Sequence, residues 1–130
     1  MSAQNISTSN AAPAVGPYLQ SQGVAIPASA SLIFTSGQLP AEQSGKIDLS
    51  QPVGVLTERC IANIKGILEA SNSGIDKVIK ATVFLTSMDS FAEVNQVYEK
   101  HFSHKPARSC VAVKELPKGV PVEIEVIALA

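Results

Sequence analysis

Three charged side chains stand inside apolar runs near the C-terminal end of this 130-residue chain. Arg108 lies in the run 106–113, and Glu123 and Glu125 lie in the run 122–126. Such charges are costly to bury unless each is paired or meets a ligand. An arginine fork can hold a carboxylate by two parallel hydrogen bonds, and a carboxylate can orient a water molecule and accept its proton. The residue types therefore fit either binding and hydrolysis of a small acid or a structural ion pair within the chain.

Both runs alternate in the manner of β-strands, whose side chains point to opposite faces in turn. Arg108 and Cys110 therefore share one face of the first strand. Glu123 and Glu125 share one face of the second strand, opposite its valine and isoleucine residues. A Leu-Pro-Lys-Gly turn at 116–119 predicts that the two strands are joined tightly. Spacing alone does not choose between the two glutamates.

Four further residues could complete such a site, and each has a simpler explanation. Ser36 and Gly37 end a short strand, where a glycine permits a ligand to approach the backbone closely, although an ordinary turn explains them equally well. Tyr18 could donate a hydrogen bond to a ligand or merely pack against its neighbours. Asn95 lies on a helical segment and could tie a loop or contact the substrate.

The cysteines and histidines predict neither a metal site nor a nucleophile. Cys60 and Cys110 lie far apart without metal-ligand spacing, which favours free thiols in a reducing compartment. A nucleophilic cysteine would need a nearby histidine. His101 and His104 instead fall at the end of a helix, where surface positions are expected.

The elements that must position these residues follow from hydrophobic spacing. Strands are predicted over residues 18–25, 32–36, 78–85, 106–113 and 122–126, and helices over residues 53–71 and between 87 and 106. Ser50 is the predicted cap of the first helix, and a glycine signal near residue 74 is expected to end it. Ser87 or Asp89 is expected to cap the second helix. The first two strands are predicted to form a hairpin.

This order predicts an α/β or α+β fold in which both helices cover one face of the sheet. The other face would then expose a large apolar area in a monomer. We therefore expect identical chains to cover it in a closed, symmetric oligomer.

Composition limits the classes of function. One globular domain over residues 1–130 is expected, since 45% of the residues are hydrophobic. The net charge of −1 gives no general attraction to nucleic acid, and no apolar run could span a bilayer. Residues 1–14 contain no lysine or arginine, so they do not have the features of a secretory or transit signal. A cytosolic location is expected, with a processed mitochondrial form as the alternative.

Short motifs along nearly the whole chain resemble one family. They are GPY at 16–18, TSGQLP at 35–40, NI at 63–64, VNQVY at 94–98, PARSC at 106–110, LPKG at 116–119 and EIE at 123–125. Each is weak alone, but together and in this order they resemble the Rid family of reactive intermediate deaminases. This family is also called the YjgF-type or L-PSP endoribonuclease family. The intact pentapeptide at 106–110 is similar to that of its imine deaminase (RidA) subgroup.

The resemblance implies a fold, an assembly and a reaction. The fold would be chorismate-mutase-like, with a mixed sheet of about six strands and two helices on one face. Three chains would form a homotrimer with clefts between subunits. The reaction would be hydrolysis of 2-iminobutanoate and 2-iminopropanoate, which pyridoxal-phosphate-dependent dehydratases release, to 2-oxo acids and ammonia. No metal or organic cofactor would be needed.

The resemblance also assigns roles to residues. Arg108 would bind the carboxylate of the imino acid, Glu123 would be the catalytic carboxylate, and the backbone of Cys110 would contact the ligand. The remaining substrate-binding positions would be Tyr18, Ser36, Gly37 and Asn95. Two other functions stay open: RNA cleavage or translation inhibition, as the older family name suggests, and a non-catalytic regulatory trimer that binds small acids.

Overall fold

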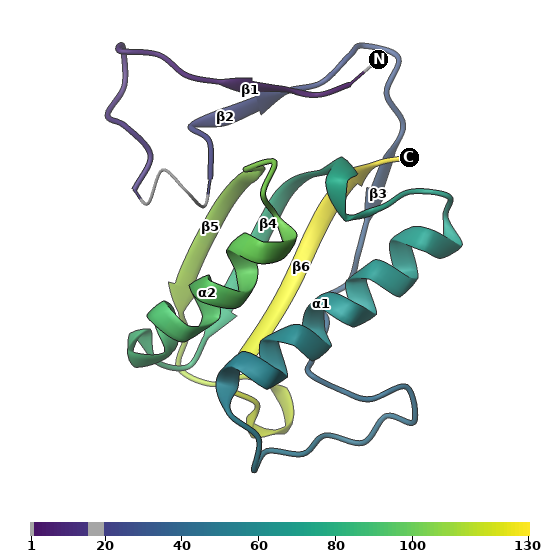
Figure 1. Ribbon diagram of the computed structural model, residues 1–130, viewed down its shortest axis with the longest axis vertical. Coiled ribbons are helices and arrows are strands. Elements are labelled where there is room, and N and C mark those ends of the chain that lie inside the picture. The colour runs from purple at the N-terminus through teal and green to yellow at the C-terminus, as the bar shows by residue number, and fades with distance from the viewer. Residues whose placement is uncertain (1, 16–19) are drawn as a thin grey trace.

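Two helices lie on one face of a four-stranded sheet, and a separate two-stranded hairpin lies beyond one end of that sheet (Figure 1). The computed structural model describes residues 2–15 and 20–130. The strands are β1 (Gln4–Ile6), β2 (Gly23–Ala25), β3 (Leu32–Phe34), β4 (Val78–Leu85), β5 (Ala107–Ala112) and β6 (Val122–Leu129). The helices are α1 (Val53–Ala70) and α2 (Phe91–His101). Short 3₁₀ turns cover Ile75–Lys77, Met88–Ser90 and Pro117–Gly119.

The main sheet is mixed, as predicted, but it has four strands rather than about six. Its order is β3-β6-β4-β5, with β5 parallel to β4 and the other pairs antiparallel. Strands β1 and β2 pair with each other in a separate sheet. Local alternation indicates that a segment is a strand, but it does not specify which strands share a sheet. The expected α+β class is confirmed, and the expected single six-stranded sheet is not.

Two expected hairpins are wrong for the same reason. β2 begins at Gly23 and pairs with β1, whereas β3 pairs with β6. β5 and β6 are not neighbours, because β4 lies between them. The connection between them crosses the end of β4, where the Val113 amide donates to the Leu85 carbonyl at 2.7 Å. The turn at 116–119 is therefore present, with Lys118 and Gly119 at positive φ, but it serves a crossover.

The first helix has the predicted bounds to within one residue, but its two ends are capped by other groups than expected. The side chain of Ser50 hydrogen-bonds to Asp48, and no side chain caps the first turn within α1 itself. The carboxylate of Glu93, on α2, accepts a hydrogen bond from the Gly54 amide at 2.6 Å. An anion suits this end of a helix, whose amides lack partners and whose dipole is positive. After the helix ends, Asn72 adopts the positive φ that was expected of a glycine.

The predicted cap Ser87 is present, but it caps the 3₁₀ turn before the second helix, whose own first residue follows Ser90 without a side-chain cap. The side chain of Ser87 accepts a hydrogen bond from the Asp89 amide and so caps the 3₁₀ turn that leads into α2. The chain then continues directly from that turn into the helix at Phe91.

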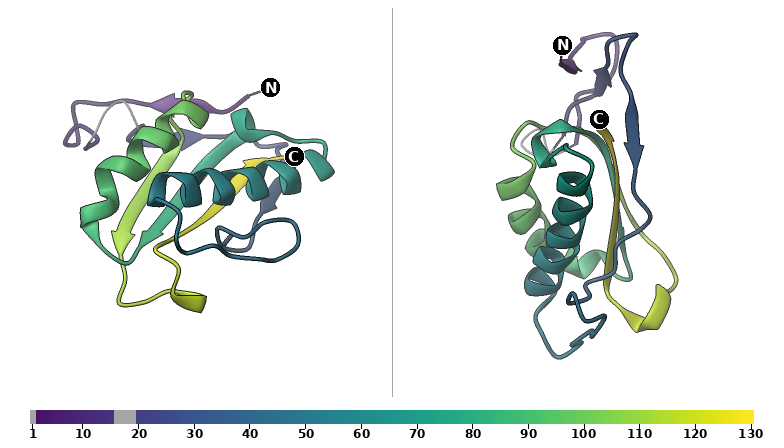
Figure 2. Two further views of the ribbon diagram at one scale, coloured as in Figure 1. Left: turned by 60° about the horizontal axis from the view of Figure 1, so that its bottom comes forward. Right: turned by 90° about the vertical axis from the view of Figure 1, so that its right-hand side faces the viewer.

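The hydrophobic core lies between the helices and the inner face of the sheet. From α1 the fully buried residues include Leu56, Cys60, Ile64 and Leu68, and from the sheet they include Ala81, Val83, Leu85, Val122, Ile124 and Ala128. Both helices stand on the same side of the sheet (Figure 2), which confirms the prediction. Among the described residues, no helix is both long enough and apolar enough to cross a membrane.

The outer face of the sheet is only partly buried. Strand β6 alternates regularly, so Glu123, Glu125 and Ile127 point away from the helices. Phe34 on β3 is 69% exposed, and Val111 on β5 is 44% exposed.

Candidate active site

Arg108 lies on the helix-covered face of the edge strand β5 and is only 8% exposed. Its Nη1 donates to Oδ1 of Asn95 at 2.7 Å, and its Nε donates to Oε1 of Gln20 at 3.3 Å. Its Cζ lies 4.8 Å from the centroid of the Tyr98 ring and 5.8 Å from that of Phe91. The guanidinium is therefore surrounded by neutral groups.

Helix α2 supplies three of these four partners. Phe91, Asn95 and Tyr98 are spaced four and three residues apart, so they share one face of the helix. Helix α2 connects β4 to the parallel strand β5, and it therefore lies over the strand that carries Arg108. The structure thus places Asn95 against the arginine rather than against a loop.

The buried arginine has no carboxylate partner within the described residues. The ion pairs found there join other residues, Arg59 to Glu42 and His101 to Glu58. The sequence left two explanations for Arg108, a ligand site or an ion pair with a glutamate of the same chain. The described residues contain no such ion pair. Two of the five N–H donors of Arg108 are used by amide oxygens. The local dielectric is low around a buried cation. The attraction between such a cation and an incoming anion is therefore stronger than the attraction at a solvated cation.

Cys110 shares the face of Arg108, as predicted, and is a half-buried free thiol. Burial raises its pKa, although the nearby Arg108 charge acts in the opposite direction. His101 pairs with Glu58 at 2.7 Å, and His104 lies 2.9 Å from the Val78 carbonyl. Neither histidine forms a hydrogen bond with the thiol in the described chain, so the geometry supplies no activated cysteine.

Glu123 lies on the opposite face of the sheet, against the segment that contains Ser36 and Gly37. A Cβ atom at Gly37 would overlap the Glu123 carboxylate, so a larger residue here would force the glutamate side chain to move. Hydrogen bonds between Gln38 and Ile124 hold this segment to β6. The group that lies close to Gly37 in one chain is therefore the Glu123 carboxylate, and the approach of a ligand to this glycine stays a prediction.

Glu125 occupies a different place on the same outer face. It pairs across the sheet with Thr82 and lines a small cavity of about 130 Å³ together with Phe34 and Lys80. The contact with Gly37 thus distinguishes Glu123 from Glu125, which spacing in the sequence could not do.

The two predicted halves of the site do not meet within one chain. The ladder pairs Glu123 with Phe84 and Phe84 with Val111, which is three residues beyond Arg108 on β5. Two strand spacings and three residues put the Cα atoms of Arg108 and Glu123 roughly 14 Å apart. Their side chains also point to opposite faces. Tyr18, the remaining predicted residue, lies outside the described residues.

Sequence reasoning missed Gln20, Phe91 and Tyr98 as partners of the arginine. The helical spacing of Phe91, Asn95 and Tyr98 was a signal for two of them, because it puts both rings beside an asparagine. Gln20 lies 88 residues away in sequence and had no comparable signal.

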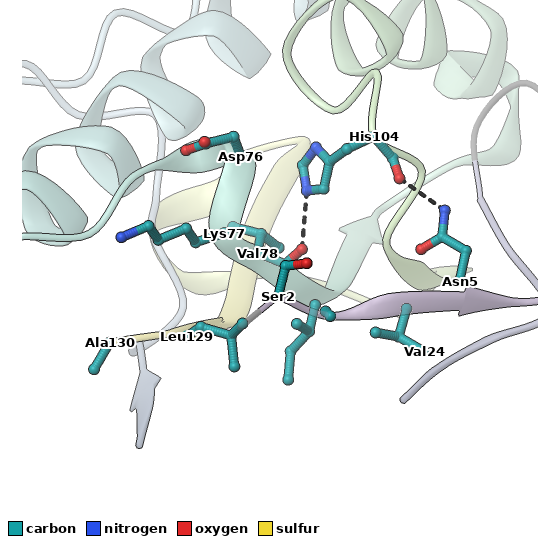
Figure 3. A pocket seen from close by; sticks show the side chains of 11 residues that line it. Ser2, Asn5, Val24, Asp76, Lys77, Val78, His104, Leu129 and Ala130 are labelled. Atoms are coloured by element: carbon teal, nitrogen blue, oxygen red, sulfur yellow. Dashed lines mark hydrogen bonds between the residues drawn. The ribbon is translucent and has the colours of Figure 1, made fainter. Parts of the chain in front are cut away.

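A groove of about 510 Å³ lies elsewhere, between the N-terminal hairpin and the body of the molecule (Figure 3). His104 and Asn5 line it, and the Asn5 amide donates to the His104 carbonyl at 2.9 Å. None of the residues predicted to act on a ligand is among its lining residues. Within the described chain, moreover, no group of three or more acidic, histidine or cysteine residues could hold a metal ion.

Comparisons with known proteins agree on one family. The model of the family described as "Endoribonuclease L-PSP" matches residues 8–130. The mitochondrial Protein MMF1 of Saccharomyces cerevisiae is 42% identical over 125 residues, which cover 95% of this chain and 82% of that protein. The 2-iminobutanoate/2-iminopropanoate deaminase of Salmonella typhimurium is 39% identical over 131 residues, which cover 97% of both. The crystal structure of E. coli TdcF with bound serine is 38% identical, with a TM-score of 0.71 over 98% of both chains.

Proposed function

The chain belongs to the endoribonuclease L-PSP family, also known as the YjgF/Rid family, and on this basis we propose that it hydrolyses small 2-imino acids. The proposed substrates are 2-iminobutanoate and 2-iminopropanoate, and the products are the 2-oxo acids and ammonia. The observation that carries the proposal is the buried Arg108, which has neutral partners and no carboxylate among the described residues.

Each half of the site has one task in the proposed reaction. Arg108 binds the carboxylate of the imino acid through parallel hydrogen bonds and so fixes the position of the imine carbon. Glu123 orients a water molecule and accepts its proton as the water oxygen bonds to that carbon. That proton is delivered to the imine nitrogen, which gives a carbinolamine. The carbinolamine hydroxyl then loses its proton to the amino group, the carbon–oxygen double bond forms as the carbon–nitrogen bond breaks, and ammonia leaves the 2-oxo acid.

The proposed site is built by two copies of the chain. One copy alone cannot bring Glu123 to Arg108, because the two side chains lie on opposite faces of the sheet. In the proposed site, a second copy supplies its Glu123 beside the substrate that the Arg108 of the first copy binds. A closed homotrimer repeats this contact three times.

An assay of ammonia release tests the activity. A threonine dehydratase generates 2-iminobutanoate, and the protein is expected to accelerate hydrolysis well above the spontaneous rate. Binding of 2-oxobutanoate without acceleration would favour the non-catalytic regulatory alternative. RNA cleavage by the same preparation, at a net charge of −1 and without imine hydrolysis, would favour the endoribonuclease alternative.

A mixing experiment tests the shared site. Arg108→Ala and Glu123→Gln are each expected to inactivate the protein when expressed alone. Co-expressed at equal levels, they should recover about one quarter of the wild-type activity, because one cleft in four then has both native side chains. A site formed within one chain would recover none.

The proposed place of action is the cytosol, and a mitochondrial form is the alternative. The name of the yeast relative MMF1 supports the alternative. Cell fractionation followed by immunoblotting separates the two.

A further inference from the structure

The groups that hold Arg108 share one property, which is that none of them carries a charge. Asn95 and Gln20 offer amide oxygens, and Tyr98 and Phe91 offer ring faces. Aromatic faces attract a guanidinium through their quadrupole, and amide oxygens accept its hydrogen bonds. Both kinds of contact orient the cation without cancelling its charge.

We propose that the α2 residues Phe91, Asn95 and Tyr98 form an uncharged cradle that positions Arg108 and leaves its full charge available to the ligand's carboxylate. Asn95 is thereby a positioning residue that acts through the arginine rather than a substrate contact. The inference rests on the proposed function, since it specifies how that site selects an anionic substrate.

The packing of Tyr98 supports this role. Its side chain is fully buried, and its ring stacks on Phe102 with centroids 4.3 Å apart. With one ring face covered by Phe102, the guanidinium of Arg108 occupies the other. The hydroxyl has no hydrogen-bond partner in the described chain, so the ring is the part of the side chain that makes the contact.

The ionisation state of Tyr98 agrees with an uncharged cradle. Burial raises the pKa of its hydroxyl well above the ordinary value, and the Arg108 charge offsets this only in part. The side chain is therefore neutral at physiological pH. A phenolate at this position would pair with the guanidinium and compete with the ligand.

One substitution separates charge from hydrogen bonding. Asn95→Asp keeps the size of the side chain and an acceptor oxygen, but it places a carboxylate at the 2.7 Å contact with Arg108. The resulting ion pair should weaken binding of 2-oxobutanoate, measured by calorimetry at pH 7.5, by at least about tenfold. The melting temperature should be unchanged or higher, because a buried cation gains a partner.

Two variants serve as controls. Gln96→Glu makes the same amide-to-carboxylate change at the next residue of α2, which is exposed, and should leave the affinity within about twofold. Asn95→Ala removes the hydrogen bond without adding a charge, and it should weaken binding less than Asn95→Asp does. If Asn95→Asp does not fold, Gln20→Glu carries the same test at the Nε contact.

The outcomes are distinct. Wild-type affinity in a folded Asn95→Asp protein, or equal losses in Asn95→Asp and Asn95→Ala, would overturn the uncharged cradle. If Gln96→Glu lost as much affinity as Asn95→Asp, the added negative charge alone would explain the loss, and the uncharged cradle would be overturned as well. Failure of the wild-type protein to bind 2-oxobutanoate or to hydrolyse the imine would instead count against the proposed function.

Discussion

Arg108 and Glu123 differ in how many contacts their charged groups make within one chain. Arg108 is packed under α2, with two hydrogen bonds and two aromatic neighbours. Glu123 lies on the uncovered face against Gly37, and its carboxylate forms no hydrogen bond to a described residue. One chain thus supplies four contacts to the cation and leaves the carboxylate half open.

The difference suggests that the two faces of the sheet have different roles. The inner face is buried by the chain's own helices, so it can hold a charge in a fixed orientation. The described chain leaves the outer face open, so in the proposed assembly a second copy would complete the surroundings of Glu123. Substitutions in the two halves should therefore have different kinetic signatures.

The largest effect is expected from Arg108→Ala. Loss of two charge-assisted hydrogen bonds to the substrate carboxylate should lower kcat/KM for 2-iminobutanoate roughly a thousandfold. Steady-state kinetics with the dehydratase-coupled assay measure this loss. Arg59→Ala, which removes a partly exposed arginine paired with Glu42, should leave the activity unchanged. A folded Arg108→Ala protein with native kinetics would contradict the role of the arginine.

Glu123→Gln should have the next largest effect, of a different kind. The amide cannot accept a proton from water, so kcat should fall about a hundredfold while the affinity for 2-oxobutanoate changes little. The matched control is Glu125→Gln, two residues along on the same face, which should retain nearly full activity. If the control loses activity and Glu123→Gln does not, the roles of the two carboxylates are reversed.

These two residues also show how far the sequence could predict the site. The period of two in each strand correctly separated Arg108 and Cys110 from the residues on the other face, because alternation is a local property. Whether Arg108 and Glu123 face the same side of the sheet depends on strand order and register. Those are set by long-range pairing, which local patterns do not encode. The same limit explains why the expected hairpin between β5 and β6 was wrong.

The helices were predicted more accurately than the sheet. Periodic apolar residues specify both the length and the buried face of α1 and α2, since the hydrogen bonds of a helix are local. The cap of α1 was not predictable, because Glu93 of the other helix supplies it. Gln20 is a partner of Arg108 for a similarly non-local reason. The family motifs, by contrast, favour Glu123 where spacing had left Glu125 equally eligible.

A smaller effect is expected from Gly37→Ala, which tests the carboxylate half through its backbone. The added Cβ would overlap the Glu123 carboxylate and force that side chain to move. A misplaced general base should lower kcat about tenfold, with little change in the affinity for 2-oxobutanoate. Gly66→Ala is the control, because no atom lies within 4 Å of its new Cβ and it should stabilise α1 by about 1 kcal/mol. Unchanged kcat in Gly37→Ala would argue that Glu123 need not occupy this position.

The smallest effect is expected from Cys110→Ser, although this thiol shares a strand face with Arg108. Burial raises the pKa of Cys110, so at neutral pH the thiol is protonated and the thiolate becomes abundant only as the pH rises. If the backbone rather than the thiol contacts the ligand, the serine variant should keep activity within about threefold of wild type from pH 6 to 9. Stopped-time assays across this range measure both profiles. A loss of a hundredfold or more, with a wild-type rate that rises with pH as the thiolate forms, would make Cys110 a nucleophile and remove the need for Glu123 as the base.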